Sequence, residues 1–145
     1  MVVAVCGAIT GCGEGSKGPG VATAVESACD KANEGKRLTL EGFLAFPRSM
    51  KAKDISIMMR MRPSFEDRDK VVGVSVGLGS GANQVELPPK EYTGAEMKVH
   101  TQDGKVLGYR DKFKVTGTMY YPSSAAQVEF ACGLTNTSIE SAGGK

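Results

Sequence analysis

The side chains that could do chemistry in this sequence are few and widely spaced. The chain has 145 residues, four cysteines and a single histidine, His100. No two cysteines stand in C-x-x-C spacing, so neither a zinc site nor thioredoxin-like redox chemistry is predicted. A lone histidine beside solvent-facing residues is more often solvated than catalytic. The nearest approach to a nuclease-type acidic cluster is Asp67 and Asp69 beside Arg68, in a charged stretch typical of a solvated turn. The sequence therefore predicts a protein that is not an enzyme and that uses no metal or other cofactor.

The chain opens with an uncharged apolar stretch that ends in a Gly-Cys pair and several glycines. Gly7, Gly11 and Gly13 form a G-x-x-x-G-x-G pattern that is similar to a nucleotide-binding fingerprint. That fingerprint needs a helix to begin at its last glycine, whereas the residues that follow, EGSKGPG, disfavour a helix. A Walker loop is also disfavoured, because Ser16 stands where its second glycine should be. A nucleotide site is therefore not predicted.

Residues Ile9 to Cys12, I-T-G-C, resemble the lipobox of bacterial lipoproteins. The apolar segment from Val2 to Thr10 has the length of a signal peptide rather than of a membrane span. In that family the cysteine receives a diacylglycerol and the chain is cut just before it, which implies lipidation of Cys12. The Gly/Ser-rich stretch that follows suits a flexible tether. The resemblance thus implies a signal peptide over residues 1–11 and a lipid-anchored tether over residues 12–20.

No lysine or arginine precedes Lys17, although signals of this family normally begin with one. We therefore expect the true start of the signal to lie upstream of Met1. Gly13, rather than aspartate, follows the cysteine, which resembles the sorting pattern for the outer membrane of enteric bacteria. This favours the outer membrane over the inner one, with the domain facing the periplasm. The alternative is a first strand or a disordered tail that happens to contain a Gly-Cys pair.

The composition is that of one folded domain. Charged residues make up 23% of the chain and hydrophobic residues 41%, which is an ordinary balance for a soluble domain of 145 residues. The formal net charge of +2 is too small to indicate nucleic-acid binding on charge alone. No apolar run approaches the roughly twenty residues that a membrane-spanning helix needs.

Beyond the tether, the hydrophobic pattern predicts one helix and then strands. From Val21 to Ala32 apolar residues recur at intervals of three and four, and Gly35 supplies a C-terminal stop, so an α-helix is predicted over residues 21–34. The period then changes to two. Gly42 interrupts the inner row of the first strand, as glycine does where a strand bends. The five segments that alternate are Lys36–Phe46, Ile55–Arg62, Val72–Leu78, Lys112–Tyr121 and Gln127–Leu134.

A long excursion from Gly79 to Arg110 separates the third and fourth strands. Its Asp103-Gly104 turn predicts a small hairpin between Val99 and Leu107. Five half-buried strands need a closed or nearly closed sheet to hide their edges. The fold class is therefore mainly β: a small five-stranded Greek-key barrel with one N-terminal α-helix and a hairpin excursion.

Three segments look like the first, fourth and fifth strands of an OB-fold: GKRLTLEGFL, YRDKFKVTGTMYY and CGLTNTSIE. The phrase DKFKVTGT, ahead of a closing strand that ends in TSIE, is similar to OB domains of the anticodon-binding-like type. The resemblance covers about residues 33–140 and implies an OB-like barrel, with the folded part over residues 21–141 and a disordered tail over 142–145. With the lipobox, the chain resembles the uncharacterised bacterial OB-fold lipoproteins. The alternative is an unrelated small β-barrel or sandwich.

Two cysteines remain once the signal and the lipid site are set aside. Cys29 lies on the apolar stripe of the expected helix, and Cys132 lies on the inner row of the last expected strand. An exported protein matures where disulfides persist, so a bridge between the two is predicted. The alternative is two separately buried small hydrophobic side chains.

The most basic region of the sequence is the candidate ligand-binding surface. On an OB-fold, the second and third strands and their flanking loops are the usual ligand face. Basic side chains with an aromatic neighbour there suit an anionic glycan, a peptide or a nucleic-acid strand, and export disfavours nucleic acid. An ordinary charged surface is the alternative. The candidate residues are Arg48, Lys51, Lys53, Arg60, Arg62 and Phe65.

The sequence thus predicts a non-enzymatic bacterial envelope lipoprotein whose OB-like barrel binds an unidentified glycan, peptide or protein. Its membrane partner is lipid, through acylated Cys12. One alternative is a structural or assembly role in the envelope without a small ligand. Another is a cytoplasmic OB-fold module that binds single-stranded nucleic acid, which requires that the first residues are no signal.

Overall fold

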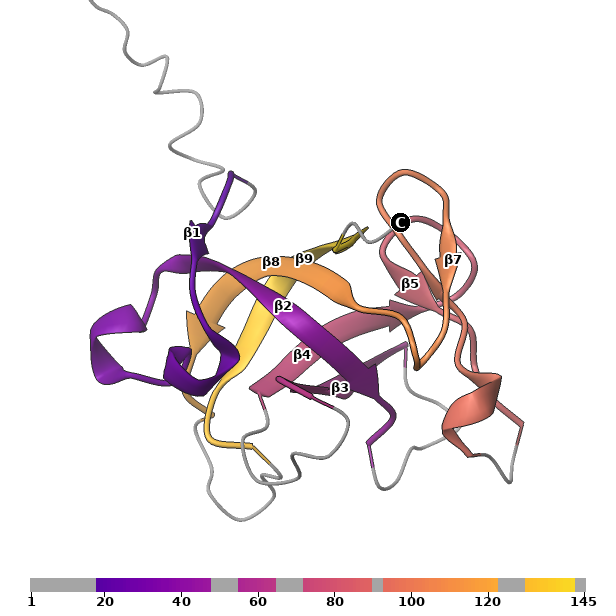
Figure 1. Ribbon diagram of the computed structural model, residues 1–145, viewed down its shortest axis with the longest axis horizontal. Coiled ribbons are helices and arrows are strands. Elements are labelled where there is room, and N and C mark those ends of the chain that lie inside the picture. The colour runs from indigo at the N-terminus through magenta and orange to yellow at the C-terminus, as the bar shows by residue number, and fades with distance from the viewer. Residues whose placement is uncertain (1–17, 48–54, 65–71, 90–92, 123–129, 143–145) are drawn as a thin grey trace, which may run out of the picture.

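Five long strands close into a barrel in the computed structural model, which describes residues 18–47, 55–64, 72–89, 93–122 and 130–142 (Figure 1). The predicted signal peptide, Cys12 and most of the predicted tether lie outside the described residues, as do residues 143–145 of the predicted tail. The barrel strands are β2 (Arg37–Ala45), β3 (Ser56–Arg62), β4 (Val72–Leu78), β8 (Phe113–Tyr120) and β9 (Gly133–Ser141).

The strand pairing closes the sheet without free edges in the barrel. Strand β2 pairs with both β3 and β8, β3 pairs with β4, and β8 pairs with β9, all antiparallel. A parallel pairing of β4 with β9 completes the ring. The protein is therefore mainly β, as predicted, and its closed five-stranded barrel is compatible with an OB-like fold.

Gly42 lies where β2 changes partner. Residues 37–42 of β2 pair with β8, and residues 43–45 pair with β3 on the other side. A β-carbon on Gly42 would collide with the carbonyl oxygen of Arg62, the last residue of β3. The close approach of these two backbones explains why a glycine interrupts the inner row of this strand.

The prediction of an α-helix over residues 21–34 is wrong. The segment begins with the short strand β1 (Val21–Ala22), which pairs in parallel with β2. It continues in two 3-10 turns, η2 (Val25–Ser27) and η3 (Lys31–Asn33). Every helix among the described residues is a three-residue 3-10 helix.

Local hydrogen bonds explain why the helix does not form. The Asn33 side chain donates to the carbonyl oxygens of Ser27, at 3.0 Å, and Ala28, at 3.4 Å. An α-helix would use those carbonyls for its own backbone, so the side chain competes with the helical ladder. The predicted apolar stripe is confirmed at Val25 and Ala28, which are buried, and at Cys29, which packs against the core, whereas Val21 is 64% exposed.

The excursion between β4 and β8 extends one edge of β4. It contains β5 (Gln84–Val85), the 3-10 turn η4 (Gly94–Glu96), β6 (Val99–His100) and β7 (Val106–Leu107). Strand β5 pairs in parallel with β4, and β6 is antiparallel to both β5 and β7. The predicted hairpin is confirmed: Val99 lies opposite Leu107, and Gly104 in its turn has φ +93°.

Two strand boundaries differ from the prediction. Ile55 is 86% exposed, and β3 begins only at the next residue. Strand β9 begins at Gly133 and runs to Ser141, whereas residues 127–129 of the predicted strand lie outside the described residues. Asn136 has φ +53°, and the register of β8 with β9 shifts between Thr116 and Thr118. This irregularity interrupts the alternation of inward and outward side chains along β9, so the full extent of the strand could not be predicted from that alternation.

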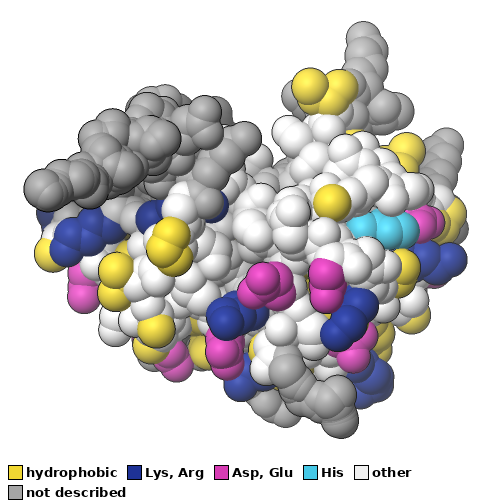
Figure 2. Space-filling model, turned by 90° about the horizontal axis from the view of Figure 1, so that it is seen from above, with side chains coloured by type: hydrophobic (Ala, Val, Ile, Leu, Met, Phe, Trp, Pro, Cys, Tyr) yellow, Lys and Arg dark blue, Asp and Glu magenta, His cyan; other side chains and the backbone are white. Residues whose placement is uncertain are grey.

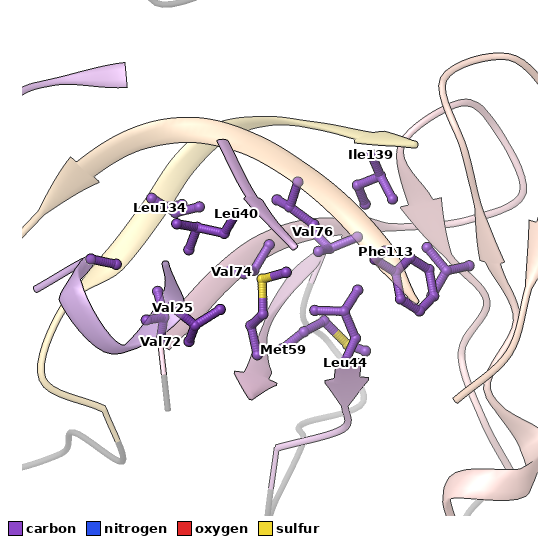
Figure 3. Close-up of a cluster of buried hydrophobic side chains, with 14 of the residues drawn as sticks. Val25, Leu40, Leu44, Met59, Val72, Val74, Val76, Phe113, Leu134 and Ile139 are labelled. Carbon is purple, nitrogen blue, oxygen red and sulfur yellow. The ribbon is translucent and has the colours of Figure 1, made fainter. Parts of the chain in front are cut away.

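The core fills the barrel along its length (Figure 3). Val25 from the N-terminal segment lies beside Val72 at one end, and Phe113 and Ile139 lie towards the other. The excursion adds Val85, Met97 and Val99 to the same cluster. The inward rows of the barrel supply most of the remaining core: Leu38, Leu40, Leu44, Ile57, Met59, Met61, Val72, Val74, Val76, Phe113, Val115, Met119, Leu134 and Ile139.

Candidate binding face

Two of the predicted surface residues lie on β3, and the others lie outside the described residues. Arg60 and Arg62 alternate with the buried Met59 and Met61, so both belong to the outward row of the strand. Outside the described residues are Arg48, Lys51, Lys53 and Phe65, together with Asp67, Arg68 and Asp69 of the acidic stretch. The outer surface around Arg60 is therefore where the predicted ligand face can be assessed.

Arg60 begins a row of residues that crosses four strands in register. It lies opposite Gly73 of β4, and Gly73 lies opposite Gly133 of β9. Gly133 in turn lies opposite Tyr120 of β8. Two glycines therefore stand between an arginine and a tyrosine on the outer surface of the barrel.

These two glycines let aromatic rings lie directly on the sheet. A β-carbon on Gly73 would stand 2.9 Å from ring atoms of Phe130, and one on Gly133 would stand 2.9 Å from ring atoms of Tyr120. Any larger residue at either position would displace the ring above it. The Tyr120 hydroxyl reaches back towards β3 and donates to the sulfur of Met58 at 3.9 Å. We refer to Met58, Arg60, Tyr120 and Phe130 as the aromatic face.

All four side chains of the aromatic face are half-buried. Burial raises the pKa of the Tyr120 hydroxyl above its ordinary value of 10.0, because the phenolate would lose hydration. Tyr120 is therefore neutral at physiological pH. Rings beside a guanidinium can contact planar or apolar parts of a ligand while the charged group takes a polar part.

The predicted strand Gln127–Leu134, with Cys132 on its inner row, places Phe130 on that row as well because side chains alternate, and this prediction is wrong. Phe130 precedes β9 and lies on the outside of the barrel against Gly73. The signal for this arrangement was the glycines of β4, because Gly73 alternates with buried valines and thus leaves space on the outer surface. The sequence alone did not say which ring fills that space.

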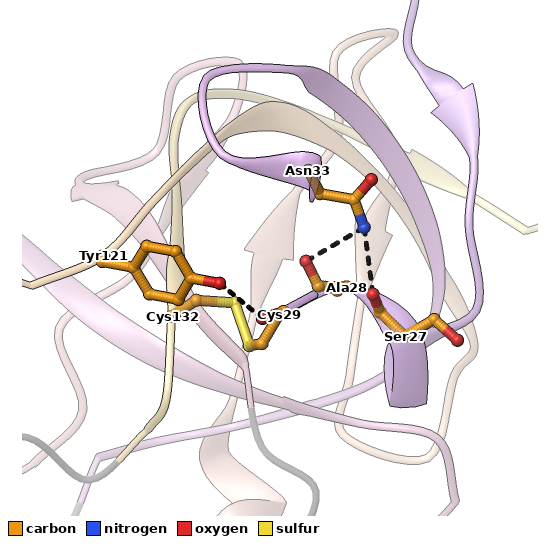
Figure 4. Close-up of a disulfide and its surroundings, with 6 residues drawn as sticks. All are labelled: Ser27, Ala28, Cys29, Asn33, Tyr121 and Cys132. Carbon is orange, nitrogen blue, oxygen red and sulfur yellow. Dashed lines mark hydrogen bonds between the residues drawn. A yellow bond between two sulfur atoms is a disulfide. The ribbon is translucent and has the colours of Figure 1, made fainter. Parts of the chain in front are cut away.

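Cys29 and Cys132, the predicted pair, form a disulfide with their Cα atoms 5.5 Å apart (Figure 4). The Tyr121 hydroxyl donates to the carbonyl oxygen of Cys29 at 2.6 Å, and Lys31 lies 5.8 Å from the centre of the Tyr121 ring. The bridge ties the N-terminal segment to the residue just before β9. It therefore holds the end of the barrel that carries Phe130.

His100, predicted to be solvated, is largely enclosed. Its side chain is 15% exposed, and its Nε2 lies 2.8 Å from a carboxylate oxygen of Glu86 (cyan beside magenta in Figure 2). This pair joins β6 to the residue that follows β5. Its contacts are those of a structural link within the excursion.

Other kinds of site are not formed by the described residues. They contain no helix with the length and apolar character needed to cross a membrane. Nor do they bring together three histidine, cysteine, aspartate or glutamate side chains in the way a metal ion requires.

No model of a known protein family matches this chain, and no curated protein sequence matches it significantly.

Proposed function

We propose that this protein is a non-enzymatic bacterial envelope lipoprotein whose OB-like barrel binds a glycan, a peptide or another protein. Lipid on Cys12 anchors the chain, with the barrel in the periplasm and the outer membrane favoured over the inner one. The observation that carries the binding role is the aromatic face, in which Tyr120 and Phe130 lie on a floor formed by Gly73 and Gly133.

The composition of the aromatic face supports a role in binding. Tyrosine, phenylalanine, methionine and arginine are enriched where proteins bind partners, and tyrosine and arginine contribute much of the energy at such sites. The face also lies over β3 and β4, the strands that correspond to the usual ligand face of an OB-like barrel. It includes Arg60, which the sequence had already indicated.

The position of the first described residues suits a membrane tether. Arg37, the first residue of β2, donates from its Nε to the carbonyl oxygen of Gly18 at 2.6 Å, which fixes where the chain enters the domain. Six residue steps separate Cys12 from Gly18, and an extended chain covers at most about 20 Å in that distance. A lipid on Cys12 would therefore keep the barrel close to the bilayer surface.

A second candidate function is the binding of single-stranded nucleic acid by a cytoplasmic protein. The same observation favours it, since aromatic rings beside an arginine stack nucleobases without sequence preference. The two functions differ in their response to salt, because binding to a nucleic-acid backbone weakens steeply as salt concentration rises.

The proposed function is tested by binding of the full chain carrying Cys12→Ser. The probes are isolated cell-wall glycan, in a sedimentation assay, and a labelled single-stranded oligonucleotide, at two salt concentrations. We expect binding to the glycan, and we expect Phe130→Ala to weaken it about 2- to 10-fold, the range that one aromatic contact spans. Leu87→Ala is the matched control, because Leu87 is an exposed apolar residue outside the aromatic face.

Two outcomes would redirect the proposal. Salt-dependent binding to the oligonucleotide, with none to the glycan, would support the second candidate function. If the protein bound neither probe but co-purified stoichiometrically with another envelope protein, the result would support a structural or assembly role instead. Melting curves of each variant show whether a loss of binding reflects a loss of folding.

A further inference from the structure

A second polar groove lies on a different part of the barrel surface and centres on Arg37. One half of the groove has a volume of about 440 Å³ and lies between the N-terminal residues Gly18–Gly20 and the outward residues of β8 and β9. The other half, of about 590 Å³, continues towards Asn83 and Gln102 of the excursion. Arg37 and Ser138 line both halves, so the two form one continuous groove with Arg37 at its middle.

The half of the groove between the N-terminal residues and β9 is lined by uncharged hydrogen-bonding side chains together with one further cation, Lys114, and one carboxylate, Glu140. Thr39 of β2, Thr116 of β8 and Ser138 of β9 line it, and Thr39 and Thr116 hydrogen-bond to each other at 2.8 Å. Seen from above, the middle of the molecule is mostly white, the colour of the backbone and of side chains that are neither apolar nor charged, and the apolar and charged side chains lie mainly around it (Figure 2). Such a floor offers donors and acceptors for hydroxyl groups over an extended area.

Hydrogen bonds hold the far wall of the groove in place. The Asn83 carboxamide accepts from the backbone N–H of Ile139 at 2.8 Å and donates to the Gln102 side chain at 2.6 Å. The backbone N–H of Gln102 donates to the carbonyl oxygen of Ile139 at 2.7 Å. The excursion is thereby fastened to β9, so this wall of the groove is preorganised.

The Arg37 guanidinium is held by neutral acceptors only. Its Nη1 donates to the carbonyl oxygen of Asn136 at 2.9 Å and to the Thr118 hydroxyl at 3.4 Å, in addition to the bond from Nε to Gly18. Three of its five N–H donors are used in this way, and the two on Nη2 meet no acceptor among the described residues. No carboxylate within the described part of the chain forms an ion pair with it.

The surroundings of Arg37 also disfavour the charged form of its guanidinium. Partial burial lowers the pKa of the Arg37 guanidinium from its usual value, because the charged group loses hydration. An anionic group that entered the groove would supply the missing counter-charge, and hydrogen bonds between ionised groups are the stronger kind.

We infer that this groove is a binding site for an acidic saccharide, with a carboxylate at Arg37 and sugar hydroxyls on the polar floor and walls. The guanidinium, already oriented by three hydrogen bonds, donates from Nη2 to the carboxylate. Thr116, Ser138 and Gln102 exchange hydrogen bonds with the hydroxyl groups of the same chain. This site is separate from the aromatic face, so the two can be tested independently.

The test is calorimetric titration of the full chain carrying Cys12→Ser with an oligogalacturonate as probe. The uncharged galactose oligomer of the same length is the matched ligand. We expect the acidic oligomer to bind and Arg37→Gln to weaken it by about tenfold or more, as for the loss of a hydrogen bond to an ionised group. Arg110→Gln, which removes the same charge outside the groove, should leave binding within about twofold.

A second variant, in the far wall of the groove, and the uncharged oligomer test the inference independently of Arg37→Gln. Gln102→Ala removes an exposed side chain of the far wall without touching the bonds of Arg37, and it should weaken the acidic oligomer by about 2- to 10-fold. Equal affinity for the uncharged oligomer would overturn the inference. The inference would also be overturned if the acidic oligomer did not bind, or if the Arg37 and Arg110 variants lost affinity equally. Full competition by inorganic phosphate would overturn it too, because it would reveal a non-selective anion site.

Discussion

At the scale of single residues, Tyr120 has an environment that can be tested by titration. Its ring lies over Gly133, and burial raises the pKa of its hydroxyl. The folded protein therefore holds this proton more tightly than the unfolded chain does. The stability gained in this way is present below pH about 10, the ordinary tyrosine pKa, and is lost as the pH rises through the folded-state value.

We predict that Tyr120 titrates above the ordinary tyrosine pKa. The measurement is the difference in tyrosinate absorbance between the wild-type chain and Tyr120→Phe as the pH is raised, with circular dichroism recorded in parallel to follow folding. A midpoint at or below about 10 in the folded protein would show that the ring is solvated and is not lying on the sheet.

The residue scale is also where prediction from sequence was weakest. Alternation assigned Arg60 and Tyr120 to outward rows, and the structure agrees. It assigned Phe130 to the core, because a period of two was extended across the residues before Gly133 where β9 has not yet begun. Which ring packs on which glycine depends on how strands that are far apart in the sequence pair, and a local hydrophobic pattern does not contain that information.

At the scale of elements, the long strands could be predicted and the N-terminal helix could not. Inward and outward residues alternate along β2, β3 and β8, and the valines of β4 recur at every second position, so the period of two is visible in the sequence. Residues 21–34 also carry a regular apolar spacing, but the Asn33 side chain competes for two backbone carbonyls, and pairing with β2 and the disulfide at Cys29 hold the segment in another conformation. Tertiary contacts of this kind override local helical preference.

The bend of β2 yields a prediction about stability. Gly42→Ala places a β-carbon against the backbone of Arg62, which cannot move without disturbing β3, so we expect a loss of about 1–3 kcal/mol. Gly77→Ala is the matched control, since its β-carbon would meet its nearest neighbour at an ordinary 3.7 Å. Urea denaturation measures both, and equal midpoints for the two variants would contradict the close approach at Gly42.

The disulfide yields a prediction about the same end of the barrel. Cys29 and Cys132 are 103 residues apart in sequence, and a cross-link over such a loop stabilises a protein by about 4–5 kcal/mol in the chain-entropy model. In a chain carrying Cys6→Ser and Cys12→Ser, purified from the periplasm, we expect no free thiol and a melting temperature that falls on reduction. Two titratable thiols before reduction would show that the bridge does not form.

At the scale of the whole molecule, the proposal joins a membrane anchor to a barrel with a binding surface. The anchor rests on the sequence I-T-G-C at residues 9–12, and the binding surface rests on the structure. Neither implies the other, so each needs its own experiment.

We predict that the full-length protein, expressed in a bacterium from its true start, incorporates labelled fatty acid. Cys12→Ser should abolish both the label and the cleavage of the signal. Cys6→Ser is the control, because the second cysteine of the same segment lies outside the lipobox and should have no effect. Persistent labelling and membrane fractionation of the Cys12 variant would exclude lipidation at this position.

The central claim is that the aromatic face binds the ligand, and Gly73→Ala tests it most directly. This change leaves every aromatic and charged side chain present but places a β-carbon 2.9 Å from the Phe130 ring, which must then shift from its position on the sheet. We predict that sedimentation with isolated cell-wall glycan falls about 2- to 10-fold for Gly73→Ala and stays at the wild-type level for Gly77→Ala. Undiminished binding by folded Gly73→Ala would contradict the account.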